Sequence, residues 1–91
     1  MARIVVYSTG ICPYCVRAKH LLTKLGIAFE EVRIDLDPSR RREFLEVTNG
    51  ARTVPQIVID GRCIGGYSEL SELHMEGMLA RWIPDDRGER A

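Results

Sequence analysis

A pair of cysteines with a proline between them stands where an apolar run gives way to a helical pattern, and this junction constrains the fold most. Residues 4–7 are continuously apolar, as in a short strand covered on both faces. Cys12, Pro13 and Cys15 follow shortly after. The next apolar residues recur at intervals of three and four, which predicts a helix over residues 13–25. A chain that passes so directly from a central strand into a helix begins a β-α-β unit.

The middle of the chain continues this alternation. Phe29, and then apolar residues at every second position from Val32 to Leu36, predict a second strand over residues 29–36. Asp37 followed by Pro38 is a start signal for a second helix, which Phe44 and Leu45 would anchor to the sheet. The sequence thus completes a β-α-β unit and adds a further helix.

The last third of the chain predicts a hairpin and a third helix. Two short apolar runs flank Asp60-Gly61, a dipeptide favoured in tight antiparallel turns. Ser68 is the predicted cap of the last helix. The apolar residues expected along that helix are Leu70, Leu73, Met78, Leu79 and Trp82.

The predicted order is therefore β-α-β-α-β-β-α, in one domain of residues 1–84 with a frayed polar tail at 85–91. The β-α-β unit is parallel and the hairpin antiparallel, so the fold class is α/β, a four-stranded mixed sheet with three helices on both faces. The turn that holds Cys12 lies at a carboxyl edge of this sheet, where open α/β folds bind their ligands.

Composition narrows the function. Thirteen basic and thirteen acidic residues leave no net charge, which argues against nucleic-acid or membrane-surface binding through a general electrostatic field. No run of about 18 apolar residues marks a membrane span, and three cysteines do not suit a secreted disulfide framework. We expect a cytoplasmic monomer.

The position of Cys12 favours redox chemistry. At the N-cap, with Pro13 in the first helical position, the Cys12 sulfur faces the amides of Tyr14 and Cys15 and the positive end of the helix dipole. Thiols in such places have pKa values lowered from about 8.5 to between about 3.5 and 7.5. A thiol of low pKa is also a good leaving group, which suits repeated disulfide exchange.

Other roles for the pair are weaker. A structural zinc site needs four ligands, and the remaining candidates, Cys63, His20 and His74, follow no zinc spacing. A static disulfide at an exposed helix end would tie no distant elements together. Cys63 is interpreted as a small buried residue on a strand rather than as a third redox thiol.

Three motifs in order then carry a family resemblance. CPYC after a strand, TVPQ about forty residues later and GG before a capped helix together resemble the dithiol glutaredoxins of the thioredoxin-fold superfamily. The resemblance implies a thioredoxin-like fold, catalytic Cys12 and Cys15, and a cis Val54-Pro55 peptide. It also implies that the backbone of Val54 pairs with glutathione as an added strand would.

The same resemblance implies the rest of a glutathione site. The amides of Tyr67 and Ser68 would receive the γ-glutamyl carboxylate, with Gly65-Gly66 allowing its close approach. The full implied set is Tyr14, Thr53, Val54, Pro55, Gly66, Tyr67 and Ser68.

The sequence departs from the family's pattern at two places. Ser68 stands where many relatives have an acidic residue for the ligand's ammonium group, and Glu69 is the expected substitute. Thr9 replaces a common lysine near the glycine carboxylate, and Arg42 is our candidate for the missing cation. The simpler interpretation of Arg42 is that it belongs to a solvent-exposed helix face and contacts no ligand.

The implied function is a glutathione-dependent thiol-disulfide oxidoreductase, which uses glutathione as electron donor and needs no metal. Its partners would be disulfide-containing or glutathionylated proteins. Two alternatives stay open: a module that binds a [2Fe–2S] cluster with glutathione, and a redoxin recharged by thioredoxin reductase. Relatives suited to a cluster commonly lack the second cysteine, so Pro13 and Cys15 count against that alternative.

Overall fold

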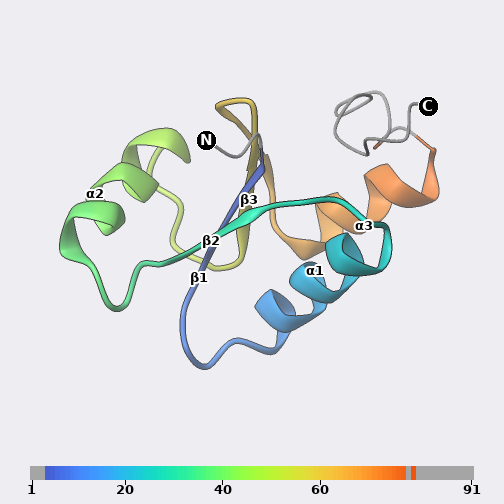
Figure 1. Cartoon of the computed structure of the whole chain (residues 1–91). Helices are drawn as coiled ribbons and strands as arrows, with labels where there is room; N and C mark the ends of the chain where they lie inside the picture. The colour runs from blue at the N-terminus through green and yellow to red at the C-terminus, as the bar shows by residue number, and fades with distance from the viewer. Residues whose placement is uncertain (1–3, 78, 80–91) are drawn as a thin grey trace.

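The computed structural model of the chain describes residues 4–77 and residue 79, and it has the predicted order of elements (Figure 1). The elements are β1 (Ile4–Ser8), α1 (Pro13–Lys24), β2 (Glu30–Arg33), α2 (Pro38–Val47), β3 (Gln56–Ile59), β4 (Arg62–Gly65) and α3 (Tyr67–Met75).

The four strands form one mixed sheet in the order β2-β1-β3-β4. β1 pairs parallel with β2 and antiparallel with β3, and β3 pairs antiparallel with β4. Figure 1 shows α1 and α3 together on one side of the sheet and α2 on the other. The expected four-stranded mixed sheet with helices on both faces is confirmed.

Two apolar layers hold the helices to the sheet because successive residues of a strand face opposite sides. Ile4 and Val6 of β1 are fully buried beside Leu22 of α1, while Tyr7 packs on Phe44 of α2. Burying one such side chain stabilises the fold by about 1.5 to 3 kcal/mol. β1 is therefore the central strand that the sequence predicted, and its carboxyl end is a rigid starting point for the loop to Cys12.

The second strand is shorter than the apolar pattern predicted. β2 ends at Arg33, and Leu36, predicted to lie in the strand, is 70% exposed in the turn that follows. The Leu36 amide donates to the Arg33 carbonyl at 3.2 Å, which bends the chain toward α2. Leu36 therefore lies outside the strand, because the chain turns there toward the start of α2.

Of the caps predicted for the second and third helices, the first is confirmed and the second is wrong. Asp37 accepts hydrogen bonds from the amides of Ser39 and Arg40 at the start of α2. α3 begins two residues earlier than predicted, with Gly66 and not Ser68 as its N-cap. The Glu69 carboxylate accepts the Gly66 amide at 2.8 Å and so ties the first turn of α3 to its N-cap residue.

Not every apolar residue predicted to anchor α2 and α3 to the sheet is buried. Phe44 is buried in α2, but Leu45 is 42% exposed because it lies on the outer side of that helix. Leu70 and Leu79 are buried as expected. Met78, Trp82 and the tail at 85–91 fall outside the described residues. Within the described part of the chain, no helix is long and apolar enough to cross a membrane.

Candidate active site

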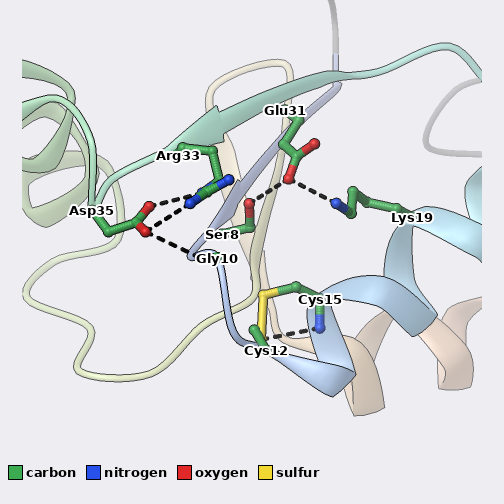
Figure 2. A network of polar contacts seen from close by, with 8 residues as sticks. All are labelled: Ser8, Gly10, Cys12, Cys15, Lys19, Glu31, Arg33 and Asp35. Atoms are coloured by element: carbon green, nitrogen blue, oxygen red, sulfur yellow. Dashed lines mark hydrogen bonds and ion pairs between the residues drawn. A yellow bond between two sulfur atoms is a disulfide. The ribbon is translucent and has the colours of Figure 1, made fainter.

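Cys12 occupies the N-cap of α1, as the sequence predicted. Its backbone is extended (φ −156°, ψ 95°), and its Sγ accepts the Cys15 amide at 3.1 Å (Figure 2). Of the two amides expected to face the sulfur, the structure gives this bond to Cys15, the third helical position. The hydrogen bond and the helix dipole both favour a thiolate at Cys12.

Cys15 lies one helical turn deeper and is 1% exposed. It forms a disulfide with Cys12, and the two Cα atoms are 5.2 Å apart. Cys12 is half-buried at the surface end of α1. An incoming sulfur can therefore reach Cys12, whereas Cys15 can react only with a sulfur already attached there.

This geometry predicts a low pKa for Cys12 in the reduced protein. We expect Cys12 to titrate well below the usual thiol pKa of about 8.5, since its sulfur caps a helix, and below Cys15, whose sulfur does not. Thiolate absorbance or pH-dependent alkylation, with the modified cysteine identified by mass spectrometry, measures this. A Cys12 pKa at the usual value or above it would contradict the capping argument.

A groove of about 730 Å³ runs beside the cysteine pair. The Cys12 Sγ lies 3.6 Å from the carbonyl oxygen of Val54, and the Val54-Pro55 peptide is cis, as the resemblance implied. Seven of the residues expected at a glutathione site line this groove: Tyr14, Thr53, Val54, Pro55, Gly66, Tyr67 and Ser68. Segments that are distant in the sequence thus meet at one surface.

The first turn of α3 forms one side of the groove. A helix leaves its first amides without partners inside the helix, and here these include the amides of Tyr67 and Ser68. A Cβ on Gly66 would lie 3.1 Å from the Pro55 carbonyl oxygen, so a glycine lets the two segments approach. The Glu69 carboxylate lines the groove but already binds the Gly66 amide. It is first of all a cap, and any contact with a ligand's ammonium group would be additional.

Gln56 organises the opposite side of the groove. It is 9% exposed, and its Nε2 donates to the carbonyl and hydroxyl oxygens of Thr53 at 3.1 and 3.3 Å. The Cys63 thiol donates to Gln56 Oε1 at 3.4 Å and also lines the groove. Cys63 is half-buried rather than fully buried, in contrast to the prediction. The TVPQ motif contained Gln56, but its partners became visible only in the fold.

The tyrosines at the groove's mouth pack together. The rings of Tyr14 and Tyr67 have centroids 6.0 Å apart, and the guanidinium of Arg17 lies 5.2 Å from the centre of the Tyr14 ring. Tyr14 is nevertheless 56% exposed. The pair presents an aromatic wall next to Cys12.

Comparison with known proteins places the chain in a family. Residues 4–64 match the family model Glutaredoxin. The chain belongs to the glutaredoxin family. Glutaredoxin 3 of Escherichia coli is 43% identical over 79 residues, which cover 87% of this chain and 94% of that protein. Glutaredoxin 1 of Rickettsia prowazekii is 39% identical over 81 residues, covering 88% and 85% respectively.

Solved glutaredoxin structures share the fold. The crystal structure of a buckwheat glutaredoxin-glutathione complex superimposes with a TM-score of 0.81 at 31% identity, covering 99% of this chain and 83% of that one. Reduced glutaredoxin C1 of Populus tremula x tremuloides gives a TM-score of 0.83 at 34% identity, covering 97% and 79%. The thioredoxin-like fold that the motifs implied is therefore confirmed.

Arg42 stands apart from the other expected glutaredoxin site residues. It is exposed on α2 and is not part of the groove's lining. Its contact with a ligand carboxylate stays a prediction. Within the described residues, no three His, Cys, Asp or Glu side chains gather in a way that could hold a metal ion.

Proposed function

We propose that this protein is a glutathione-dependent thiol-disulfide oxidoreductase. It would reduce protein disulfides through Cys12 and Cys15, and release glutathione from mixed disulfides through Cys12 alone. The observation that carries the proposal is the position of the Cys12 sulfur, which caps α1 and lies 3.6 Å from the Val54 carbonyl at the groove. A ligand lying in the groove would present its sulfur to a favoured thiolate.

The groove fits the chemistry of glutathione. The Val54 backbone at its centre offers an extended peptide the pairing of an added strand. The unpaired amides at the start of α3 suit a carboxylate, because they point outward at the positive end of the helix dipole. The volume of about 730 Å³ lies within the range of about 300 to 1,000 Å³ found for small-ligand sites.

Two electrons pass to the substrate in the proposed reaction. The Cys12 thiolate attacks one sulfur of the substrate disulfide, forms a mixed disulfide and expels the other sulfur as a thiolate, which water protonates. Cys15 then loses its proton, attacks the Cys12 sulfur and expels the second substrate thiolate. This step leaves the Cys12–Cys15 disulfide.

Glutathione returns the electrons. One glutathione thiolate opens the ring and leaves a mixed disulfide on Cys12, while Cys15 is released and protonated. A second glutathione thiolate attacks the bound glutathione sulfur. Glutathione disulfide departs, and Cys12 returns as a thiolate. A glutathionylated protein enters the cycle at this second stage, so it does not require Cys15.

A comparison of electron donors tests the proposal. Turnover of a glutathionylated peptide is followed with glutathione and glutathione reductase, and separately with thioredoxin reductase. We expect turnover with glutathione that exceeds turnover with thioredoxin reductase. The reverse preference would make the protein a redoxin recharged by thioredoxin reductase, and the glutathione dependence would be withdrawn.

The cluster-binding alternative has its own test. A [2Fe–2S] cluster held by Cys12 and glutathione from two subunits would give freshly purified protein visible absorption and a dimeric mass. We expect a colourless monomer, because Cys15 competes for Cys12 by forming the disulfide.

We further expect the protein to work in a reducing compartment such as the cytoplasm. It would act on protein disulfides and have no nucleic-acid or membrane partners.

Arg42 is our proposed cation for the glycine carboxylate of glutathione. It would reach toward the groove from the exposed side of α2, so its contact is solvated and modest. We expect Arg42→Ala to raise KM for glutathione about fivefold at low ionic strength with kcat little changed. Adding Thr9→Lys should recover part of the loss, and salt should reduce the effect. A KM within twofold of wild type would show that Arg42 is a solvent-exposed residue that does not contact the glycine carboxylate.

A further inference from the structure

Polar side chains alternate along β2 and the turn after it, on the side that faces the connection between β1 and α1 (Figure 2). Glu31 accepts hydrogen bonds from Ser8 Oγ and Lys19 Nζ, each at 2.7 Å. Arg33 donates to Asp35 through Nε and Nη2, each at 2.8 Å. Successive strand residues face opposite sides, so Glu31 and Arg33 lie opposite the buried Val32, and Asp35 follows in the turn.

Asp35 reaches the loop that leads to Cys12. Its Oδ2 accepts the Gly10 amide at 3.1 Å. Among the residues that the structure describes, no other hydrogen bond fixes Gly10 or Ile11. Packing contributes little at the end of the loop near Cys12, since the Ile11 side chain is 94% exposed, whereas Thr9 next to β1 is half-buried. The loop between β1 and Cys12 therefore depends on this carboxylate for its place relative to the sheet.

Arg33 aims the Asp35 carboxylate. The guanidinium binds both carboxylate oxygens, a geometry that fixes orientation as well as distance. A Cβ on Gly10 would lie 2.5 Å from Arg33 Nη2, so the bare backbone of the loop leaves room for the pair. The hydrogen bonds from Arg33 hold the pKa of Asp35 well below its usual value, and the Gly10 amide contributes further. The Asp35 carboxylate that accepts the Gly10 amide is therefore charged at neutral pH.

We propose that Asp35 is a positioning residue for Cys12. Through the Gly10 amide, its carboxylate fixes the loop that sets the Cys12 sulfur against the Cys15 amide. An exposed ion pair adds little to stability, so the role of Arg33 and Asp35 here is geometric. The inference rests on the proposed function only in taking Cys12 as the attacking thiol.

The rate of alkylation of Cys12 tests this role. Reduced full-length protein reacts with iodoacetamide from about pH 4 to about pH 8, the range in which a capped thiol titrates, and mass spectrometry identifies the modified cysteine. Asp35→Ala removes the acceptor for the Gly10 amide. At pH values below the Cys12 pKa, we expect this variant to have a Cys12 thiolate fraction about three- to tenfold lower than wild type, as loss of an N-cap interaction would give. Asp35→Asn keeps one acceptor oxygen for the Gly10 amide but loses one of the two hydrogen bonds from Arg33, so it should react faster than Asp35→Ala.

The sign of the effect separates positioning from other roles. Removing a negative charge near a thiol favours the thiolate, so an electrostatic Asp35 would give faster alkylation in both variants. A merely structural Asp35 would lower the melting temperature and leave the Cys12 rate unchanged. Either result overturns the proposal. Asp37→Asn removes the same charge two residues later and keeps the oxygen that caps α2, so it should match wild type. Slower alkylation of Cys12 in Asp37→Asn would also overturn the proposed positioning role of Asp35.

Hydrogen exchange provides a second measurement should Asp35→Ala fail to fold. In the unaltered protein, the Gly10 amide should exchange about tenfold or more slowly than in an unstructured peptide, because the Asp35 carboxylate accepts it. Exchange at the unstructured rate would overturn the proposal. Alkylation and exchange need no glutathione, so a failure of the proposed enzyme activity would leave both results valid.

Discussion

Cys12→Ser is expected to abolish all disulfide exchange, whereas Cys15→Ser is expected to keep the release of glutathione from mixed disulfides. A serine hydroxyl does not ionise at neutral pH and forms no disulfide, so loss of the nucleophile should cost on the order of 10⁴-fold or more. Cys15 is buried and reaches only a sulfur already on Cys12. It is needed to close the ring on a protein mixed disulfide, but a second glutathione can replace it on a glutathionylated Cys12.

Two coupled assays separate these activities. One uses a glutathionylated peptide and the other a protein disulfide, both with glutathione and glutathione reductase. Cys15→Ser should lose turnover selectively in the second assay. Cys15→Ala is the matched control and should give the same pattern, because the division of labour depends on the missing sulfur and not on the new hydroxyl. Equal loss of deglutathionylation in the Cys12 and Cys15 variants would refute this division.

The order of elements could be predicted because short local patterns specify it. Asp37-Pro38 starts α2 as expected, with the carboxylate accepting two amides. Asp60 and Gly61 adopt left-handed backbone angles (φ 52° and 81°), which a tight turn between two strands requires. Cys12 caps α1 for the same kind of local reason. Each of these features depends on a few neighbouring residues, which the sequence displays directly.

The boundaries that were predicted wrongly depend on distant contacts. Leu36 continued the alternation of β2, but the chain must leave the sheet there to place α2 on the opposite face. Ser68 had the better capping side chain, yet the N-cap of α3 is Gly66, at a point where a Cβ would lie only 3.1 Å from the Pro55 carbonyl oxygen. Neither constraint can be found within a few residues of the boundary.

The polar side chains along β2 were missed for a related reason. The alternation predicted the buried face of the strand from its apolar members, although the same period places Glu31 and Arg33 together on the other face. That these side chains meet the loop before Cys12 follows from the parallel pairing of β1 and β2, which sets Ser8 opposite Arg33. Local periodicity therefore predicts which residues share a face, and the topology decides what that face meets.

The largest effect on glutathione binding is expected at the start of α3. Tyr67→Pro and Tyr67→Ala both remove the aromatic ring, but only proline removes the Tyr67 amide that would receive the γ-glutamyl carboxylate. A hydrogen bond to a charged group contributes about 1.5 to 3 kcal/mol, so KM for glutathione should be about ten- to hundredfold higher in Tyr67→Pro than in Tyr67→Ala. The kcat should differ little, because this contact binds the ground state and the transition state alike.

The helix should survive this substitution, which makes the comparison informative. Tyr67 is the first residue of α3, where proline costs no internal hydrogen bond and its fixed φ suits the helix. The preceding Gly66 is already extended (φ −95°, ψ −156°), as a residue before proline must be. Similar melting temperatures for the two variants would verify that the fold is kept. If their KM values for glutathione then agree within twofold, the carboxylate binds elsewhere than at this amide.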